Sequence, residues 1–550
     1  TKFQQRYPLT PDGSFPFAEV DVLQLGFYVQ DKWTPSNRFS LTYGLRVDMP
    51  IFLTDLQENP AVAANTYRDG IKIDVSKYPN AKPQFSPRFG FNYKPFDDEN
   101  GSLQIRGGTG LFTGTPPYVW ISNQAGNNGV LFGDLNVRAV KDKNDNIISD
   151  GRPSLGFTGN MDTYKPAEGS ATRSDIAITD PDFKYPSLWK SNIAADYKFG
   201  DGWVATVELL YSKDINAIYH DNIGLYRTEQ FVNDGGAGNA RPYYNGYYSD
   251  REGNQKAANH VVMLRNTSKG HSLYTTFQLQ KNFVDGILKG LYLNGSYSFG
   301  QSRGVTDGTS SVATSAWKYR AALDGNAEEV GYTAGSFDGR LLLSASYTAN
   351  WSKYAATSFG LIYQRYRPFR YSYCYNGDAN GDSQFSNDLM YIPANFDEVK
   401  DHLLPGDFDS QEDAWKAMNA FIEQDPYLSK HRGEYAERNG AVAPFANQLD
   451  LSVSHDIKIY QKNGRSHTLR FSFNIANFLN LLNRNWGVVQ TTVLGNQQYQ
   501  FLTIPKGQGP SAANNYTLKY TMAKDLDETF KDNLNDVSRW QMQFGIKYIF

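Results

Sequence analysis

The chain has 550 residues, a formal net charge of -3 and no long run of lysine or arginine, which excludes a nucleic-acid-binding protein. Its mean hydropathy is -0.55, and it has no stretch of about eighteen consecutive apolar residues that could form a transmembrane helix. The single cysteine, Cys374, excludes an internal disulfide framework.

Alternation of apolar and polar residues predicts thirteen β-strands, because successive side chains of a strand point to opposite faces. In the strand predicted over residues 446–460, for example, Leu451 and Val453 alternate with Ser452 and Ser454. The predicted strands are residues 21–33, 37–50, 84–95, 102–113, 186–199, 202–219, 271–283, 290–302, 339–351, 354–370, 446–460, 466–480 and 538–550.

The last predicted strand has a large apolar residue at every even position from Trp540 to Phe550. The other face carries Arg539, Gln541, Gln543, Gly545 and Lys547. A chain that ends on this pattern resembles bacterial outer-membrane β-barrels, in which the barrel-assembly machinery recognises a terminal strand ending in Phe. The resemblance implies an all-β fold, a transmembrane antiparallel β-barrel, in the outer membrane of a bacterial cell.

The connections between the predicted strands alternate between short and long. The short ones are Pro35 to Asn37, Phe96 to Gly101, around Gly200, Val284 to Lys289, around Ser352 and Gln461 to Arg465. The long ones are residues 51–83, 114–185, 220–270, 303–338, 371–445 and 481–536. Because outer-membrane barrels have short periplasmic turns and long extracellular loops, we expect the long connections to be extracellular. The last strand then runs inward, and Phe550 lies at the periplasmic rim.

Thirteen is an odd number, whereas single-chain bacterial barrels have even numbers of strands. An open sheet edge in the bilayer would leave unpaired backbone groups that each cost several kcal/mol. Two explanations remain open. Either one strand is missed and the chain is a complete fourteen-stranded channel, or the chain is the C-terminal part of a larger barrel.

Five segments share their pattern with one known family. They are LGFYVQDKWTPSNRFSLTYGLRVDMP (25–50), FSPRFGFNYKPF (85–96), LQIRGGTGLFTGTPPYVWISNQ (103–124), NDLMYIP (387–393) and LRFSFNIANFLN (469–480). These segments resemble the Oar-like TonB-dependent transporters of Bacteroidota. The resemblance covers nearly the whole chain and implies a 22-stranded barrel closed around an N-terminal plug. The thirteen strands would then be the last thirteen, and residues 1–20 the end of an extracellular loop. The plug, the TonB-contacting segment and other N-terminal domains would lie outside this chain.

The connection 371–445 contains a candidate calcium loop, GDANGDSQFSNDL. Its candidate ligands are Asp378, Asn380, Asp382, Gln384 (through its backbone carbonyl) and Asp388. Alternate oxygen ligands in a tight loop suit a hard cation such as Ca²⁺. The pattern departs from an EF-hand because Ser383 replaces the usual glycine and because Leu389, not Asp388, occupies the twelfth position. The alternative is a turn in which Asx side chains hydrogen-bond to the backbone. A bound calcium ion is expected to be structural.

Three arginines, Arg46, Arg88 and Arg106, are predicted on the inward faces of neighbouring strands. A basic column in the lumen could attract an anionic ligand or the acidic face of a plug. The alternative is that each arginine pairs with a nearby carboxylate such as Asp48.

Four tyrosines lie close together in the connection 220–270, within RPYYNGYYSD: Tyr243, Tyr244, Tyr247 and Tyr248. Exposed aromatic rings of this kind could stack on a sugar or bind an apolar ligand. The alternative is that the rings pack a long loop onto its neighbours.

Apolar residues at helical spacing predict a short amphipathic helix over residues 411–423, with Trp415, Met418, Phe421 and Ile422 on one face. Such a helix could form a lid, or it could pack within the loop that contains it.

The residues favour a protein that is not an enzyme. The G-x-S-x-G match at residues 300–304 ends a predicted strand and enters a loop, whereas a nucleophile elbow requires a strand-to-helix turn. The seven histidines are scattered, and the sequence has no H-E-x-x-H pair and no phosphate-binding G-x-x-x-x-G-K-[ST] loop.

The leading hypothesis is therefore the barrel portion of a TonB-dependent outer-membrane receptor that captures an extracellular ligand and imports it to the periplasm. The alternatives are a passive fourteen-stranded channel, or a surface adhesion or scaffold barrel without transport. The expected partners are the TonB complex, reached through the plug region, outer-membrane lipids, and a surface lipoprotein or other outer-membrane subunits. Because one barrel fold serves many ligands, the sequence does not identify the ligand.

Overall fold

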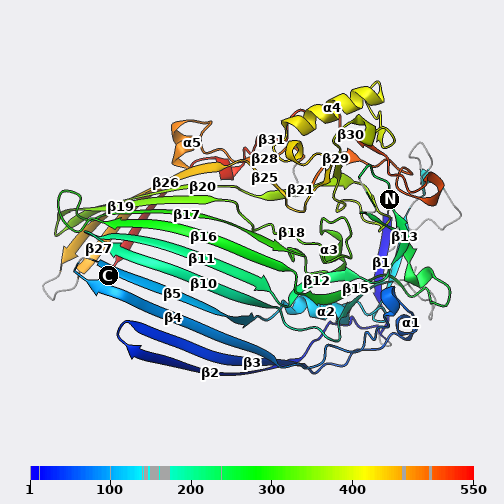
Figure 1. Cartoon of the computed structure of the whole chain (residues 1–550), viewed down its shortest axis with the longest axis horizontal. Coiled ribbons are helices and arrows are strands. Elements are labelled where there is room, and N and C mark those ends of the chain that lie inside the picture. The colour runs from blue at the N-terminus through cyan, green and yellow to red at the C-terminus, as the bar shows by residue number, and fades with distance from the viewer. Residues whose placement is uncertain are drawn as a thin grey trace.

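Thirteen long strands dominate the computed structural model, which describes residues 2–10, 13–99, 101–138, 140–141, 147–148, 160, 174–236, 238, 240–460, 466–494 and 498–550. They form one antiparallel sheet in which each strand pairs with the next one of the set along the chain (Figure 1). The strands are β2 (Val22–Ser36), β3 (Phe39–Phe52), β4 (Gln84–Asp98), β5 (Gly101–Thr113), β10 (Ser187–Phe199), β11 (Trp203–Asp214), β16 (Gly270–Asn282), β17 (Leu291–Gly304), β19 (Arg340–Ser352), β20 (Ala355–Tyr366), β26 (Ala446–Tyr460), β27 (Ser466–Ala476) and β32 (Gln541–Ile549). Each predicted strand coincides with one of them, so the predicted strand pattern is confirmed.

A fourteenth strand of this sheet, β18 (Gly331–Tyr332), has only two residues and pairs with the last two residues of β17. Within the described residues, β2 pairs only with β3, and β32 pairs only with β27. Among the described residues, no helix is both long enough and apolar enough to cross a bilayer.

The two faces of the sheet have opposite chemistry. Tyr93, Ile105, Ala195, Val207, Phe277, Tyr297 and Leu341 lie opposite one another in a row across seven neighbouring strands. The adjacent row is displaced by one residue on each strand and therefore lies on the other face. It consists of Asn92, Arg106, Ala194, Glu208, Thr276, Ser298 and Arg340. Phe277 and Tyr297 are 47% and 46% exposed. An apolar face that stays exposed beside a polar face is the pattern of a membrane barrel wall.

The last strand follows the same rule. Phe544 lies opposite Phe473, and Ile546 lies opposite Phe471, so the apolar faces of β32 and β27 coincide. On the other face, Arg470 lies opposite Lys547 and also pairs with Asp456 of β26 at 2.6 Å.

Four predicted strands are shorter than expected. The one predicted over 538–550 is observed as Gln541–Ile549 and follows a 3-10 turn at Asp536–Ser538. The strand predicted over 202–219 ends at Asp214, because the N–H groups of Ile215 and Asn216 both donate to the carbonyl of Ser187 and interrupt the ladder. The chain continues as β12 (Ala217–Asn222), which pairs with β15 (Ala258–Thr267) in another sheet. The strand predicted over 354–370 ends before Pro368, which has no N–H to donate to a ladder, and β21 (Arg370–Asn376) follows. The strand predicted over 466–480 ends at Ala476, because Asn477 adopts a left-handed conformation and begins the helix α5 (Phe478–Leu482).

The short connections lie at one end of the sheet, at the left of Figure 1, and the long ones gather at the right and along the top. The predicted turn at 461–465 and residue 100 of another short turn lie outside the described residues, as does much of 139–173. We call the described parts of the six long connections, together with residues 2–20, the loop cap.

The loop cap contains short sheets and helices of its own. Its strands are β1 (Lys2–Pro8), β6 (Phe132–Arg138), β7 (Val140–Lys141), β8 (Ile147–Ile148), β9 (Ser174–Thr179), β12, β13 (Leu225–Phe231), β14 (Pro242–Tyr247), β15 (Ala258–Thr267), β21, β22 (Tyr391–Ile392), β23 (Leu403–Leu404), β24 (Glu434–Tyr435), β25 (Ala441–Val442), β28 (Gln490–Thr492), β29 (Gln498–Thr503), β30 (Tyr520–Met522) and β31 (Phe530–Asp532). Its helices are α1 (Pro60–Ala63), α2 (Tyr118–Gly126), α3 (Ala313–Lys318), α4 (Gln411–Gln424), α5 and the 3-10 turns η1 (Arg68–Gly70), η2 (Tyr248–Asp250), η3 (Phe396–Glu398), η4 (Leu428–Lys430), η5 (Ala512–Asn514) and η6 (Asp536–Ser538).

The buried apolar cores lie in the loop cap. The largest joins the connections 371–445 and 481–536, and the other three join the connections nearer the N-terminus. The helix α4 confirms the helix predicted over 411–423. Ser410 caps it by accepting a hydrogen bond from the N–H of Asp413, and Met418, Phe421 and Ile422 are buried in the largest core.

Candidate functional site

The three predicted lumen arginines lie on the same polar face of β3, β4 and β5. Arg46 lies opposite Ser86, and Arg88 lies opposite Gly110, so their side chains share one face with Arg106. Counted along β4, Arg46 is level with Ser86, two residues before Arg88. Arg106 is level with Asn92, four residues after Arg88. At about 3.4 Å per residue, the levels differ by about 7 and 14 Å, so the arginines form a diagonal across the face.

Two of these arginines are neutralised by neighbours. Arg46 pairs with Asp48 at 2.7 Å, and Arg106 pairs with Asp196 at 2.9 Å. Arg88 instead lies over the ring of Phe112, 4.7 Å from its centroid, and has no ion pair among the described residues. The arrangement favours the structural interpretation for Arg46 and Arg106, whereas ligand binding by the three arginines remains a prediction.

The four predicted tyrosines pack against different parts of the loop cap. Tyr244 is 1% exposed, and its hydroxyl donates to Oδ1 of Asp324 over 2.7 Å. Tyr243 lies against the largest core, Tyr247 against the core of Trp317, and Tyr248 against the core of Val62. The rings therefore do not form one exposed surface, and the packing alternative describes this arrangement.

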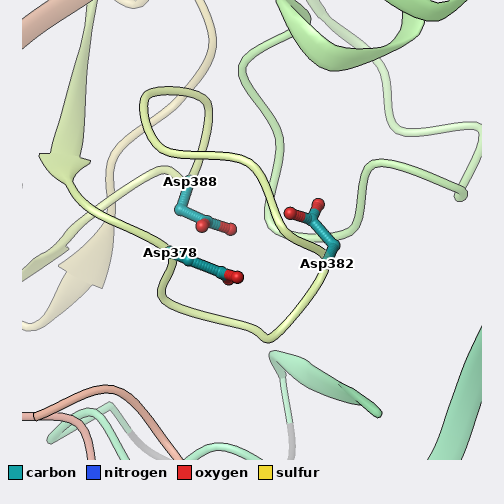
Figure 2. Close-up of side chains that lie close together, drawn as sticks. All are labelled: Asp378, Asp382 and Asp388. Atoms are coloured by element: carbon teal, nitrogen blue, oxygen red, sulfur yellow. The ribbon is translucent and has the colours of Figure 1, made fainter. Parts of the chain in front are cut away.

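The candidate calcium loop brings three carboxylates together. One oxygen each of Asp378, Asp382 and Asp388 lies within 4.8 Å of the others, and Figure 2 shows the three carboxyl groups on the inside of the loop. Asp382 and Asp388 are each 1% exposed, as is Asn380. Three of the five candidate ligands therefore lie together, and binding of calcium by the loop remains a prediction.

Backbone hydrogen bonds hold the loop in this shape. Asp378 accepts from the N–H groups of Gly381 at 2.6 Å and Ser383 at 2.8 Å, and Asp382 accepts from the N–H of Gln384 at 2.8 Å. Ser383 has φ +67°, the left-handed conformation that favours glycine. The serine at the usual glycine position thus adopts the conformation that a glycine would provide.

Burial disfavours the charged form of all three carboxyls. It raises the pKa of Asp378, and it raises the pKa of Asp382 further with the help of the negative charges of Asp388 and Asp378. Burial raises the pKa of Asp388 to about 7, although the guanidinium of Arg241 opposes the shift. A cation held between the carboxylates would relieve this repulsion.

Arg241 links the calcium loop to the connection 220–270. Its side chain is fully buried and pairs with Asp234 at 2.9 Å and with Asp388 at 3.1 Å. It also donates to the backbone carbonyl of Leu389. The connected group therefore holds four carboxylates, of Asp234, Asp378, Asp382 and Asp388, and one guanidinium. This negative excess and the all-oxygen donor set fit a divalent hard cation.

The sequence reasoning missed Arg241 and Asp234. Arg241 is the first residue of the segment RPYYNGYYSD, but nothing near it in the sequence indicates a partner that lies 147 residues away. A buried arginine becomes evident only when the two loops are seen side by side.

Comparison with known proteins gives one family match. Residues 12–504 match a family model described as "Outer membrane beta barrel domain". No curated protein matches the chain.

Among solved structures, the chain is similar to the copper transporter OprC, with 8% identity and a TM-score of 0.39 over 96% of this chain and 49% of that chain. It is similar to a mutant of the ferric enterobactin receptor PfeA from Pseudomonas aeruginosa, with 8% identity and a TM-score of 0.35 over 98% and 54%. It is also similar to the outer-membrane transporter YddB from Escherichia coli, with 10% identity and a TM-score of 0.37 over 86% and 52%. The chain spans about half the length of these structures.

Proposed function

The chain belongs to the family of outer-membrane β-barrel domains, and from this premise we propose that it is the barrel part of a TonB-dependent receptor that captures an extracellular ligand and imports it into the periplasm. The family places the protein in the bacterial outer membrane. In this proposal, the plug and the segment that contacts TonB belong to a part of the protein outside residues 1–550. The assignment to the Oar-like transporters of Bacteroidota belongs to the same proposal and is supported by motifs such as residues 25–50.

The loop cap is the observation that carries the proposal. The long connections fold together around four buried cores at one end of the sheet. Side chains supported by a packed core keep a fixed geometry, which selective ligand capture requires.

A complete fourteen-stranded channel gains no support from the sheet. Its fourteenth strand, β18, has two residues, whereas a strand needs about 9–11 residues to cross a bilayer. β18 pairs at the loop end of β17 and cannot supply a further spanning strand.

The calcium loop has a structural function in this proposal. Asp378, Asn380, Asp382, Asp388 and the backbone carbonyl of Gln384 would hold Ca²⁺, and the ion would supply positive charge to a buried acidic group. Because Asp388 also pairs with Arg241, the ion would fix the connection 371–445 against the connection 220–270.

No catalytic step belongs to the proposed function. Residues 300–304, which match G-x-S-x-G, form the end of β17, and the next helix, α3, begins only at Ala313. The strand-to-helix turn that exposes a catalytic serine is therefore absent at this position.

Conductance across a planar lipid bilayer tests the proposal. A receptor whose lumen is closed by a plug should give no steady current after insertion of the purified full-length protein. Steady open-channel current in every insertion would refute the receptor and support the passive channel. Insertion itself is verified by the resistance of the strands to protease.

A further inference from the structure

A cavity of about 440 Å³ lies where the loop cap meets the barrel wall, at the loop ends of β19 and β20. We call it the arginine pocket, and its polar lining is formed by Asp338, Arg340, Gln364, Tyr366, Arg367 and Arg370. Gln364 lies opposite Gln448, two residues from Asp450, on the polar face of the sheet. The pocket therefore opens toward the lumen side of the wall, at the end nearest the loop cap.

Positive charge is in excess in this pocket. Three arginines line it, but Asp338 is the one carboxylate among its lining residues. Arg370 donates to Oδ1 of Asp338, and Nε of Arg367 lies 3.3 Å from Oδ2 of the same carboxylate. Because one carboxylate serves two guanidiniums and Arg340 has no ion pair among the described residues, the pocket carries uncompensated positive charge.

The three guanidiniums differ in how many of their N–H groups donate to an acceptor. Arg370 is buried, and it donates from Nε to the carbonyl of Ser336 at 2.8 Å and from Nη1 to that of Asn439 at 3.1 Å. This arginine supports the fold of the loop. Arg370 is therefore the positioning residue of the pocket, since it holds Asp338 and the segment 334–339 in place.

Arg367 and Arg340 retain donors for a ligand. Nη1 of Arg367 donates to the carbonyl of Ala443 at 2.7 Å, whereas its Nε is buried and makes no hydrogen bond among the described residues, although it lies 3.3 Å from Oδ2 of Asp338. Burial lowers the pKa of Arg367, and the nearby Arg365 lowers it further. Arg340 is exposed and makes one long bond, 3.3 Å, to Gln364. A buried unpaired donor is costly, so an acceptor at this position is favoured.

From the cavity, the charge excess and the unpaired donor, we propose that the arginine pocket binds the carboxylate or phosphate groups of a small anionic ligand. Guanidinium groups bind both oxyanions through two parallel hydrogen bonds, so carboxylates and phosphates share this chemistry. The proposal deepens the proposed import function, on which it rests, by naming the charge of the ligand. Binding itself can be measured without import.

Equilibrium binding to the purified full-length protein tests the pocket with two probes, tricarballylate for carboxylates and pyrophosphate for phosphates. At least one probe should bind, and the affinity should fall as salt increases. The uncharged trimethyl ester of tricarballylate should not bind. If neither anion binds, the proposal is wrong.

Variants locate the binding. Arg340→Gln and Arg367→Gln should each weaken the affinity for the anion roughly tenfold or more, because each removes a charged hydrogen bond. Arg340→Lys should retain more of the affinity than Arg340→Gln. The matched control, Arg484→Gln, removes an exposed arginine of another loop and should change nothing.

Arg340 is exposed, so Arg340→Gln remains informative if Arg367→Gln fails to fold. Equal affinity in wild type and Arg340→Gln would overturn the proposal, as would an equal loss in Arg484→Gln. If cells do not import the anion although the purified protein still binds it through Arg340, the proposed function is wrong. The proposal that the arginine pocket binds anions would still hold.

Discussion

Nη1 of Arg241 donates to Oδ1 of Asp388 over 3.1 Å, and both side chains are buried although 147 residues separate them. This ion pair joins the connections 220–270 and 371–445 and ends in the candidate calcium loop. The fold of the loop cap therefore depends on electrostatics as well as on its apolar cores.

Replacing Arg241 by Met should destabilise the loop cap by about 3–5 kcal/mol, because Asp234 and Asp388 would remain buried without their partner. Hydrogen exchange of residues 371–392 measures this loss. The matched control is Arg227→Met, since Arg227 is 44% exposed and its pair with Asp324 should contribute only about 0–1 kcal/mol. Similar effects of the two variants would show that the buried ion pair stabilises the loop cap no more than the exposed pair does.

Calcium removal should loosen the same region. At about one hundred times its Kd, the ion should stabilise the loop cap by about 2.7 kcal/mol, so a chelator should accelerate hydrogen exchange over residues 371–392. Added calcium should reverse the effect. In Asp382→Asn, which keeps the shape of the side chain but removes its charge, the chelator should have little effect. If hydrogen exchange over residues 371–392 of the wild type is the same with calcium and with chelator, the loop does not bind a stabilising calcium ion.

Bound calcium should remove most of the pH dependence of stability between about pH 4 and 7. In chelator, the folded-state pKa of Asp388 is about 7, above its ordinary value of 3.8, so between these values the folded protein binds more protons than the unfolded protein. Stability of the loop cap should therefore fall as pH rises from about 4 to 7. With saturating calcium, the bound carboxylates are deprotonated, as they are in the unfolded protein above about pH 4, so stability should change little over the same range. Two parallel pH profiles, with and without calcium, would contradict this.

The two faces of the sheet can be tested on adjacent residues of β16. Phe277→Arg places a charge on the apolar face and should cost about 2–4 kcal/mol if the position lies near the bilayer midplane. Gln278→Arg places the same charge on the polar face, where Gln278 donates to Asn294 at 2.7 Å, and should cost much less. Denaturant unfolding in lipid vesicles compares the two. An equal cost would mean that the faces are wrongly assigned.

The sheet was predictable because each strand carries its own signal. The alternation that places Phe471, Phe473 and Ile475 on one face is local, and it also fixes the register against β32. Strand ends were less predictable. After Asp214 the chain leaves this sheet and continues as β12, which pairs with β15, and this depends on a segment about fifty residues away.

The candidate site was predictable only where its residues are close in sequence. Asp378, Asp382 and Asp388 were found together because alternate acidic residues in one loop are a local pattern. Arg241 and the arginine pocket were not found, because their residues come from different connections and meet only when the loops pack. The tyrosine segment left exposed and packed rings both open, and Tyr244 is buried in an apolar core while its hydroxyl donates a hydrogen bond to Asp324 of another loop.

Uptake by cells tests the central claim most directly. Cells that lack the protein would be compared with cells that carry it, with and without functional TonB, for import of the anionic compounds that bind the purified protein. The amount of protein at the cell surface is measured in each strain by labelling of the loop cap. The account predicts import only when both the protein and TonB are present, at equal surface amounts. Import that does not depend on TonB, or that is unchanged when the protein is absent, would contradict it.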